Sequence, residues 1–518
     1  MVYERLVLIL TALIGVVIGT YITFKSGNPG YIMAFALLPF AILLVGKARL
    51  LLIFVFISFM SGLRIPFLPG QLTMFQILAL VLGMLLLLAR IINKRPNDLS
   101  GRIRVCIIAF GLILIFTMMV RGAGFKMLGD YKWGGTRYLS LFITMLFIYF
   151  STTVKLNVKQ WRIAVIGMML AACLPMLAEM LFLLSKGHIN QHYYFFQFAG
   201  STGAQFGNFM GNEDQGRLQS AGAAGSTLFL IPFLLMKFKG VNRIFYIILF
   251  AVSSILVGLS GHRAGFVMNL LFLLVYTFVV FRKSLAKYIF VLGVTGFVGL
   301  VTVIVIGDHL PFAFQRALSW VPFAEFDRAA ELDAQGTTAW RIQVWKDALY
   351  EVPHYFWIGK GYTFDFHALD ALRRSSGADY TRLWASMSVA YHSGPLSLLI
   401  GMGITGLLVG SLILVFAVDQ HWKILRSKWN NSTLQRMHMV LSVKFFTMVV
   451  AFYLIYGDVY LSFPGFFLYM SILEGLRLSD RALAPVTVEE PKPEQAKPEG
   501  RRLIQVGGMG LGPRGARA

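Results

Sequence analysis

Long apolar runs recur along most of this chain and are separated by short polar segments. A helix needs about 20 apolar residues to cross the hydrocarbon core of a bilayer, so such runs predict membrane-spanning helices. The expected spans are residues 6–23, 30–45, 49–63, 72–92, 104–120, 138–153, 162–184, 220–236, 244–261, 264–281, 287–306, 390–418, 440–456 and 459–476. The pattern therefore predicts an all-α fold, a polytopic bundle of about 12–14 transmembrane helices.

One long polar segment, residues 307–389, interrupts this pattern. Its aromatic residues include Trp320, Trp340, Trp345, Trp357 and Trp384. A segment so rich in tryptophan is not typical of a flexible linker, so we expect one large, structured, helical loop. An alternative for each tryptophan is a role as an anchor in the lipid headgroup zone.

Within this loop, apolar positions four residues apart predict an amphipathic helix over residues 339–351. These positions are Trp340, Val344 and Ala348. Thr337 and Thr338 offer oxygens for an N-terminal cap, and Pro353 is expected to end the helix. Gly359-Lys360-Gly361 then predicts a tight turn.

Lysine and arginine are concentrated in the loop 90–104, in the loop 423–436 and in the tail after Leu476. The predicted spans put these three segments on one side, and short cytoplasmic loops are the ones enriched in Lys and Arg. We therefore expect both termini in the cytoplasm. The alternation of spans then places three segments on the outer side: 121–137, 186–219 and 307–389.

The composition agrees with a membrane protein, because 57% of the residues are hydrophobic and only 14% are charged. The net charge of +23 comes mainly from the inner loops and the tail, which would face anionic lipid. This explanation excludes nucleic acid as the expected partner. After Asp480 the chain is rich in Pro, Glu and Lys and then in Gly and Arg, so we expect residues 1–478 to form the membrane domain and residues 479–518 a disordered cytoplasmic tail.

Three arginines are expected on the outer side, where the inside-positive rule does not call for them: Arg217, Arg263 and Arg341. A guanidinium at membrane depth is costly without an anionic partner, and its planar fork suits phosphate. A lipid with a pyrophosphate headgroup would match all three. The alternatives are that Arg263 extends to the headgroups, that Arg341 pairs with Asp347, and that Arg217 pairs with Glu213 or Asp214.

His392 lies where the large loop ends and an apolar span begins. A histidine with an ordinary pKa near 6.5 accepts a proton from a hydroxyl close to neutral pH. Ser393 follows it, and Gly403 and Gly406 are small residues that allow close helix packing and a rigid site. The alternative is a boundary histidine whose ring is satisfied by a backbone carbonyl.

Three stretches in this region resemble the signatures of the O-antigen ligase/polymerase superfamily. They are Ser260-Gly261-His262-Arg263-Ala264-Gly265, Trp340-Arg341-Ile342-Gln343-Val344-Trp345 with the later Pro353 and Gly359-Lys360-Gly361, and His392-Ser393 followed by Gly403 and Gly406. They occur in the family's order, and Arg217 resembles the family's arginine at the end of the preceding outer loop. The resemblance covers about residues 200–410.

The resemblance implies transfer of a glycan, without a cofactor, at the periplasmic face of the bacterial inner membrane. The first outer loop, Lys25-Ser26-Gly27-Asn28-Pro29, has no acid that could hold a metal ion, so we expect a metal-independent reaction. Direct attack on the lipid-linked carbon would invert its configuration. The donor would be a glycan on undecaprenyl pyrophosphate, and the acceptor a hydroxyl of lipid A–core in ligases or of another glycan in polymerases. The implied roles are pyrophosphate binding by Arg217, Arg263 and Arg341 and deprotonation of the acceptor by His392, with Ser393, Gly403 and Gly406 in support.

Other functions and roles stay open from the sequence. A flippase for lipid-linked glycan is the main alternative, although its transport path would need polar groups through several spans. An O-linked protein oligosaccharyltransferase is the other. The acidic residues within 325–333 could ligate Mg²⁺ through their oxygens, but they lie among apolar residues as an exposed helix face would, which favours a metal-free site. Glu179 is either an acceptor-site or a helix-pairing residue.

Overall fold

The computed structural model describes residues 47–64, 73–93, 99–125, 132–184, 197–198, 218–235, 243–376 and 379–483. The expected spans 6–23 and 30–45 and the chain from residue 484 onward lie outside these ranges. Within them the fold is all-α, as predicted. The only sheet in these ranges is the antiparallel pairing of β1 (Leu63–Arg64) with β2 (Gln197–Phe198).

Each expected span from residue 49 onward overlaps one or two helices. They are α3 (Ala48–Ser61), α4 (Met74–Asn93), α5 (Gly101–Arg121), α6 (Gly135–Ser151), α7 (Val158–Ala171), α8 (Leu174–Leu184), α10 (Ala221–Leu228), α11 (Ile231–Leu235), α12 (Arg243–Leu259), α13 (Arg263–Phe281), α14 (Leu285–Ile306), α19 (Gly394–Leu425), α20 (Ser432–Leu454) and α21 (Val459–Arg481). Seven segments in the described ranges are long and apolar enough to cross a membrane, and four shorter apolar helices accompany them. A polytopic membrane fold is therefore confirmed.

The large loop is helical, as expected, but the limits of its main helix were predicted wrongly. The loop contains η4 (Gly307–His309), α15 (Phe312–Leu318), α16 (Arg328–Tyr355), α17 (Phe366–Ser376) and α18 (Tyr380–Met387). The N-cap of α16 is Asp327, whose carboxylate accepts a hydrogen bond from the Ala329 N–H at 2.8 Å. Thr337 and Thr338 lie inside α16, because the strong helix formers before them extend the helix toward its N-terminus. Pro353 also lies within it, near the end.

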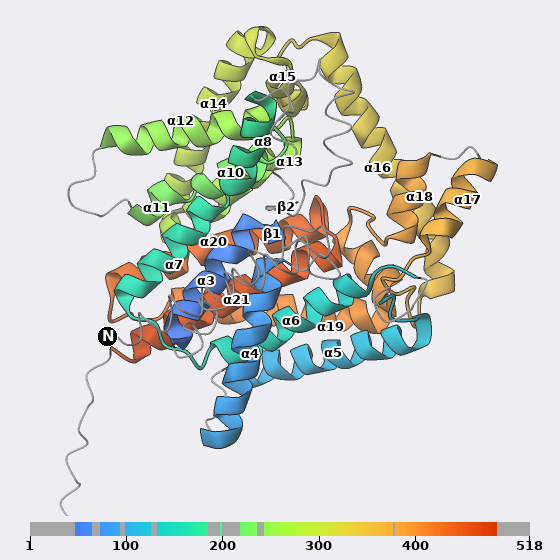
Figure 1. The fold of residues 1–518 in the computed structure, drawn as a ribbon. Helices are drawn as coiled ribbons and strands as arrows, with labels where there is room; N and C mark the ends of the chain where they lie inside the picture. The colour runs from blue at the N-terminus through green and yellow to red at the C-terminus, as the bar shows by residue number, and fades with distance from the viewer. Residues whose placement is uncertain are drawn as a thin grey trace, which may run out of the picture.

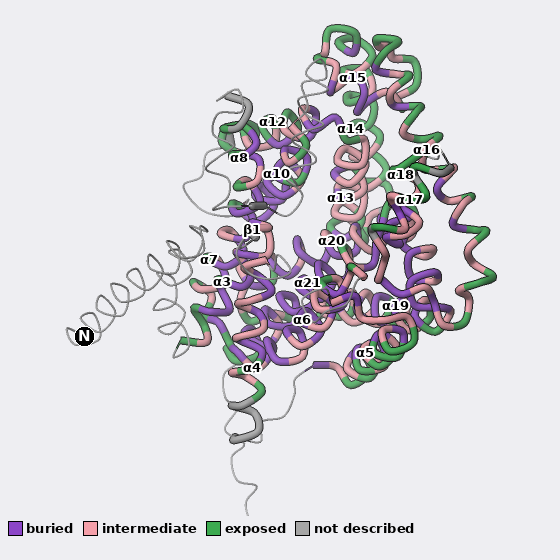
Figure 2. Tube along the Cα trace, turned by 45° about the vertical axis from the view of Figure 1, so that its right-hand side comes forward, coloured by how far each residue is buried: buried purple, intermediate pink, exposed green. Residues whose placement is uncertain are grey.

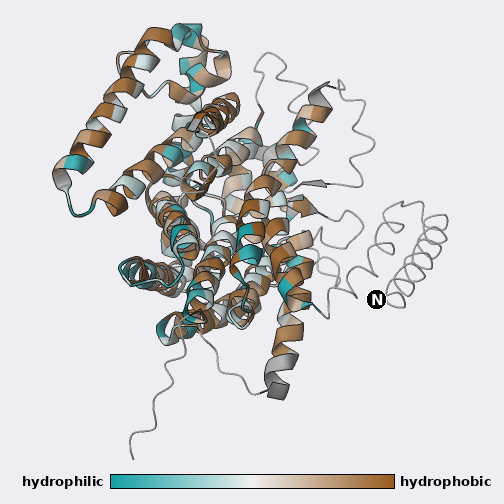
Figure 3. Ribbon diagram, turned by 90° about the vertical axis from the view of Figure 1, so that its left-hand side faces the viewer, coloured by the Kyte–Doolittle hydropathy of each residue, from teal (hydrophilic) through white to brown (hydrophobic). Residues whose placement is uncertain are grey.

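Helix α16 joins two parts of the molecule at the end of the bundle that carries the loop, here called the loop-side end. It runs along the right of Figure 1 from beside α15 to beside α18, and it also packs on α19. Buried residues concentrate in α21 and the helices around it (Figure 2). By contrast, α14 contains no buried residue among those described, and its Phe290 and Phe297 are largely exposed. Hydrophobic residues are frequent along the helices (Figure 3). These exposed apolar surfaces are what a lipid-facing helix requires.

A backbone break in α19 attaches the loop to the membrane helices. Gly403 has φ +73° and ψ −177°, a conformation that only glycine adopts readily, and it interrupts the helix. There the Ile404 N–H donates to the Phe356 carbonyl at 2.7 Å, and the Gly361 N–H donates to the Gly401 carbonyl at 3.0 Å. A Cβ on Gly403 would lie 2.3 Å from the Trp357 carbonyl oxygen. The sequence predicted that Gly403 packs against another membrane helix, whereas in the structure Gly403 packs against Trp357 of the loop.

The structure places a turn at residues 356–358, directly before the predicted turn Gly359-Lys360-Gly361, whose glycines continue the change of direction. Gly359 and Gly361 have φ of +78° and +76°, the left-handed region that glycine tolerates best. The Lys360 N–H between them donates to the Ile400 carbonyl at 2.6 Å. The turn thus fixes the first part of α19 against the loop, close to the position of His392.

A cationic pocket with a histidine at the loop-side end

His392 lies in the short connection between α18 and α19, in a backbone conformation with φ +54°. A positive φ is uncommon for a residue with a side chain, and it costs free energy that the surrounding contacts must offset. The imidazole stacks on Tyr456 with ring centroids 4.8 Å apart and lies 5.4 Å from the Trp340 ring. Its side chain keeps 26% of its surface exposed. The ring is therefore held between two aromatic side chains and still open to a ligand.

Asp458, in the connection between α20 and α21, faces His392 and was not identified from the sequence. Its carboxylate is fully buried, and one oxygen lies 3.3 Å from His392 Nδ1. The other oxygen accepts hydrogen bonds from the His392 backbone N–H at 3.1 Å and from Ser397 Oγ at 3.2 Å. The sequence feature that could have identified Asp458 is a single acidic residue in a short connection between two spans. The carboxylate can orient the imidazole and stabilise its protonated form.

A second set of contacts holds the residue before His392. The Tyr391 hydroxyl donates to Glu351 at 3.0 Å, and the Tyr391 carbonyl accepts from Trp345 Nε1 at 2.9 Å. Glu351 also forms an ion pair with Lys360 at 2.6 Å. Helix α16 and the glycine turn thus fix Tyr391, and through it the strained backbone of His392. Ser393 is the N-cap of α19 but makes no side-chain capping bond.

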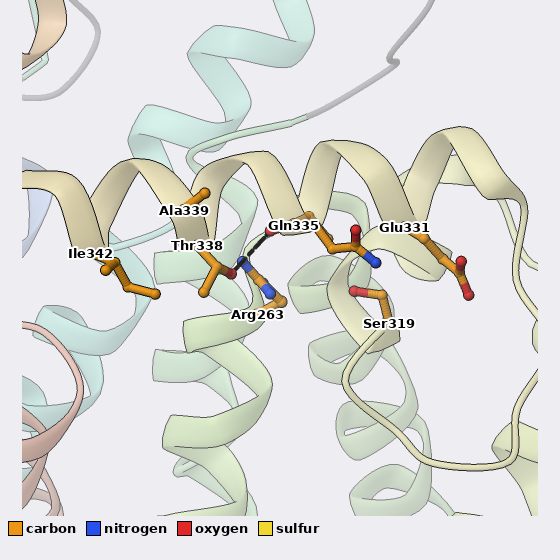
Figure 4. A pocket seen from close by; sticks show the side chains of 8 residues that line it. Arg263, Ser319, Glu331, Gln335, Thr338, Ala339 and Ile342 are labelled. Carbon is orange, nitrogen blue, oxygen red and sulfur yellow. Dashed lines mark hydrogen bonds between the residues drawn. The ribbon is translucent and has the colours of Figure 1, made fainter.

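Arg263 is the first residue of α13 and follows Gly261, whose φ is +65°. Its Nη2 donates to the Ala334 carbonyl at 2.8 Å, to Thr337 Oγ1 at 2.9 Å and to Thr338 Oγ1 at 2.8 Å. Figure 4 shows this side chain extending from α13 to α16. The alternative in which it extends to lipid headgroups is therefore not what the structure contains. Arg263 instead connects the loop helix to the membrane helices.

Arg341 lies in the middle of α16 and not at the start of a helix, which corrects the expectation from the sequence. Its guanidinium is 6.0 Å from the centre of the Tyr456 ring, and it forms no ion pair with any residue in the described ranges. Its expected alternative partner, Asp347, pairs with Arg382 at 2.7 Å. Burial lowers the pKa of Arg341 from its ordinary value, and nearby Arg316 lowers this pKa further while Tyr456 opposes the shift. An unpaired guanidinium in such surroundings favours an anionic ligand.

Arg316, on α15, is a further arginine that the sequence reading missed. Its side chain is 7% exposed and forms an ion pair with Asp333, and it donates to the Gly261 carbonyl. The sequence feature that could have identified Arg316 is its place within the mainly apolar stretch Phe312–Leu318. Arg316 fixes the turn before Arg263 and adds positive charge beside it.

These side chains meet in one pocket of about 200 Å³, here called the cationic pocket. It is lined by His262, Arg263, Ala264, Arg316, Thr337, Trp340, Arg341 and His392. Three of the four predicted site residues are thus brought together from three separate parts of the chain. Arg217 lies outside the described residues, although the Leu218 N–H next to it donates to the Leu259 carbonyl at 3.0 Å.

Two acidic features flagged by the sequence have structural partners. Glu179 accepts hydrogen bonds from the backbone N–H groups of Gln219 and Ser220, both at 2.8 Å, so it pairs α8 with the start of α10. Asp333 is engaged by Arg316. In the part of the chain that the structure covers, no three His, Cys, Asp or Glu side chains are grouped to hold a metal ion.

The fold and the pocket define a polytopic helical membrane protein in which a helical loop closes a cationic, histidine-containing pocket. Residues 248–411 match the model of the O-antigen ligase family, and this match supports the O-antigen ligase/polymerase superfamily for this region. The resemblance seen in the sequence is thereby confirmed. The matched region contains Arg263, Arg341 and His392, whereas Asp458 follows it. No curated protein matches the chain.

Proposed function

We propose that the protein transfers a glycan from undecaprenyl pyrophosphate to an acceptor hydroxyl at the periplasmic face of the bacterial inner membrane. The match of residues 248–411 to the ligase family supports glycan transfer of this type. The observation that carries the finer proposal is that Arg263, Arg341 and His392 line the same pocket. Guanidinium groups beside a base match a reaction in which a phosphate leaves while a hydroxyl attacks.

In this proposal Arg341, Arg263 and Arg217 stabilise the diphosphate. Arg341 is the best placed of the residues described, because its charge has no ion-pair partner there. Negative charge grows on the bridging oxygen as the bond to the anomeric carbon breaks, and fixed cations lower the barrier most where that charge develops. The same cations would take the place of a metal ion, so the reaction is proposed to be metal-independent.

His392 is proposed to accept the proton of the acceptor hydroxyl. As the hydroxyl oxygen forms its bond to the anomeric carbon, the proton moves to the imidazole and the lipid diphosphate leaves with the electron pair of the broken C–O bond. Asp458, 3.3 Å from Nδ1, stabilises the positive charge that the ring gains. Direct displacement inverts the anomeric configuration.

A transfer assay tests this proposal. The full chain would be purified, supplied with lipid-linked glycan and acceptor, and compared with His392→Ala and with the control His354→Ala. His354 is exposed on α16, outside both the cationic pocket and its lining, and its ring lies 3.3 Å from the Tyr350 carbonyl oxygen. We expect His392→Ala to lose roughly 10²–10⁴ in rate, as for a general base, and the control to stay near wild type. Full transfer by His392→Ala would exclude the base assignment, and movement of lipid-linked glycan across a bilayer without transfer would favour a flippase.

A further inference from the structure

A second pocket adjoins the cationic pocket at Arg263. It has a volume of about 400 Å³ and lies between α15 and α16, lined by Arg263, Ser319, Glu331, Ala334, Gln335, Thr338, Ala339 and Ile342. We call it the α15–α16 pocket. The cationic pocket, at about 200 Å³, is below the roughly 300–1,000 Å³ typical of small-molecule sites, whereas the α15–α16 pocket falls within that range. A substrate larger than a diphosphate and its reacting carbon must therefore extend out of the cationic pocket.

The polar groups of the α15–α16 pocket lie along one face of α16. Glu331, Gln335, Thr338 and Ile342 are spaced at i, i+4, i+7 and i+11, so they project in the same direction. In Figure 4 Gln335, Glu331 and Ser319 lie on one side of Arg263, and Ser319 of the neighbouring segment faces the two α16 side chains. Ile342 lies on the other side of Arg263. The wall thus offers hydroxyl, amide and carboxylate groups next to small apolar surfaces.

These groups suit a neutral ligand that carries hydroxyls. The Gln335 amide makes no hydrogen bond to another residue of the described chain, so it has both a donor and an acceptor free. Glu331 has only a distant ion pair, 3.6 Å, with the largely exposed Arg328. Its carboxylate would repel a second phosphate but accept hydrogen bonds from hydroxyls. Arg263, which lines both pockets, already donates hydrogen bonds from Nη2 to α16.

We infer that the α15–α16 pocket binds a sugar unit of the glycan substrate through Glu331, Gln335 and Ser319. This inference rests on the proposed function, because it places the sugar next to a diphosphate held in the cationic pocket. Arg263 then separates the two subsites, with the charged part of the substrate on one side and the hydroxyl-bearing part on the other. Gln335 is exposed and Glu331 is partly exposed, and neither belongs to the buried core, so their substitution leaves the packed core unchanged.

The test compares wild type with the double variant Glu331→Ala/Gln335→Ala and with Lys346→Ala, an exposed α16 residue outside both pockets. Two probes are used: undecaprenyl pyrophosphate without sugar, and lipid-linked glycan extracted from the membranes of the bacterium that carries the chain. We expect the double variant to bind the glycan-bearing lipid about 5- to 150-fold more weakly, from two lost hydrogen bonds, and to bind the bare lipid as wild type does.

Transfer kinetics identify which substrate supplies the sugar. A rise in KM for the donor assigns the pocket to the donor glycan, and a rise in KM for the acceptor assigns it to the acceptor glycan; either result supports a sugar subsite. Unchanged binding and unchanged KM values in an active double variant would overturn the inference and leave the proposed function standing. Absence of transfer by wild type itself would instead refute the proposed function.

Discussion

Asp458→Asn is the substitution that most directly tests the proposal that His392 acts as a base. The change keeps the size of the side chain but removes the charge 3.3 Å from Nδ1. Two unit charges at this distance interact by about 5 kcal/mol at an effective dielectric constant of about 20. If about half of the positive charge has developed on the ring in the transition state, the loss is about 2.5 kcal/mol, or roughly 10²-fold in rate.

Single-turnover transfer at saturating donor measures this loss without a contribution from binding. Ser397→Ala serves as the control, because it removes a hydrogen bond of 3.2 Å to the same carboxylate and leaves the charge in place; we expect less than about a 10-fold effect. In a His392→Ala background, Asp458→Asn should cause almost no further loss, since the carboxylate acts through the ring. Equal effects of Asp458→Asn with and without His392 would refute the coupling, as would wild-type rates in a correctly folded Asp458→Asn variant.

The structure supports four further predictions. Arg341→Lys should lose roughly 10²–10³ in turnover, because an ammonium keeps the charge but lacks the planar fork; turnover near wild type would argue against a bidentate phosphate contact. Gly403→Ala should destabilise the fold by about 1–3 kcal/mol or more, measured as a lower melting temperature, whereas Gly299→Ala, whose Cβ meets nothing within 4 Å, should stabilise it by about 0.5–1 kcal/mol. Glu351→Gln should reduce turnover by weakening the Tyr391 anchor while leaving donor affinity unchanged; a shift in affinity alone would contradict this role. Transfer should persist in excess EDTA, and a loss restored by Mg²⁺ would overturn metal independence.

The sequence was most informative about the membrane helices, because a long apolar run specifies a span almost by itself. Each span expected after residue 48 overlaps helices such as α5 and α20, and the helical nature of the loop was also predicted. The limits of α16 were not, because local signals at Thr337 and Pro353 are weak against the helix-forming residues around them. The helix propensity summed over residues 328–355 therefore set the limits of α16.

Three residues that the sequence singled out, Arg263, Arg341 and His392, line the cationic pocket, whereas their partners Asp458 and Arg316 were missed. Arg263, Arg341 and His392 were identified because charge at membrane depth is unusual. Asp458 and Arg316 were missed because their importance depends on contacts between distant parts of the chain. Asp458, just before α21, faces His392, just before α19, and Arg316 of α15 bonds to Gly261, just before α13. The role of Gly403 was also misjudged, since its backbone angles become visible only when the loop is seen against α19.

The central claim is that arginines from α13 and α16 bind the diphosphate of a lipid carrier beside His392. A cryo-EM structure of the full chain in a lipid nanodisc with bound undecaprenyl pyrophosphate tests it most directly. The account predicts both phosphates in the cationic pocket, within hydrogen-bond distance of Arg341 and close to the imidazole. Phosphates held at another part of the molecule, with Arg341 facing away from them, would contradict it.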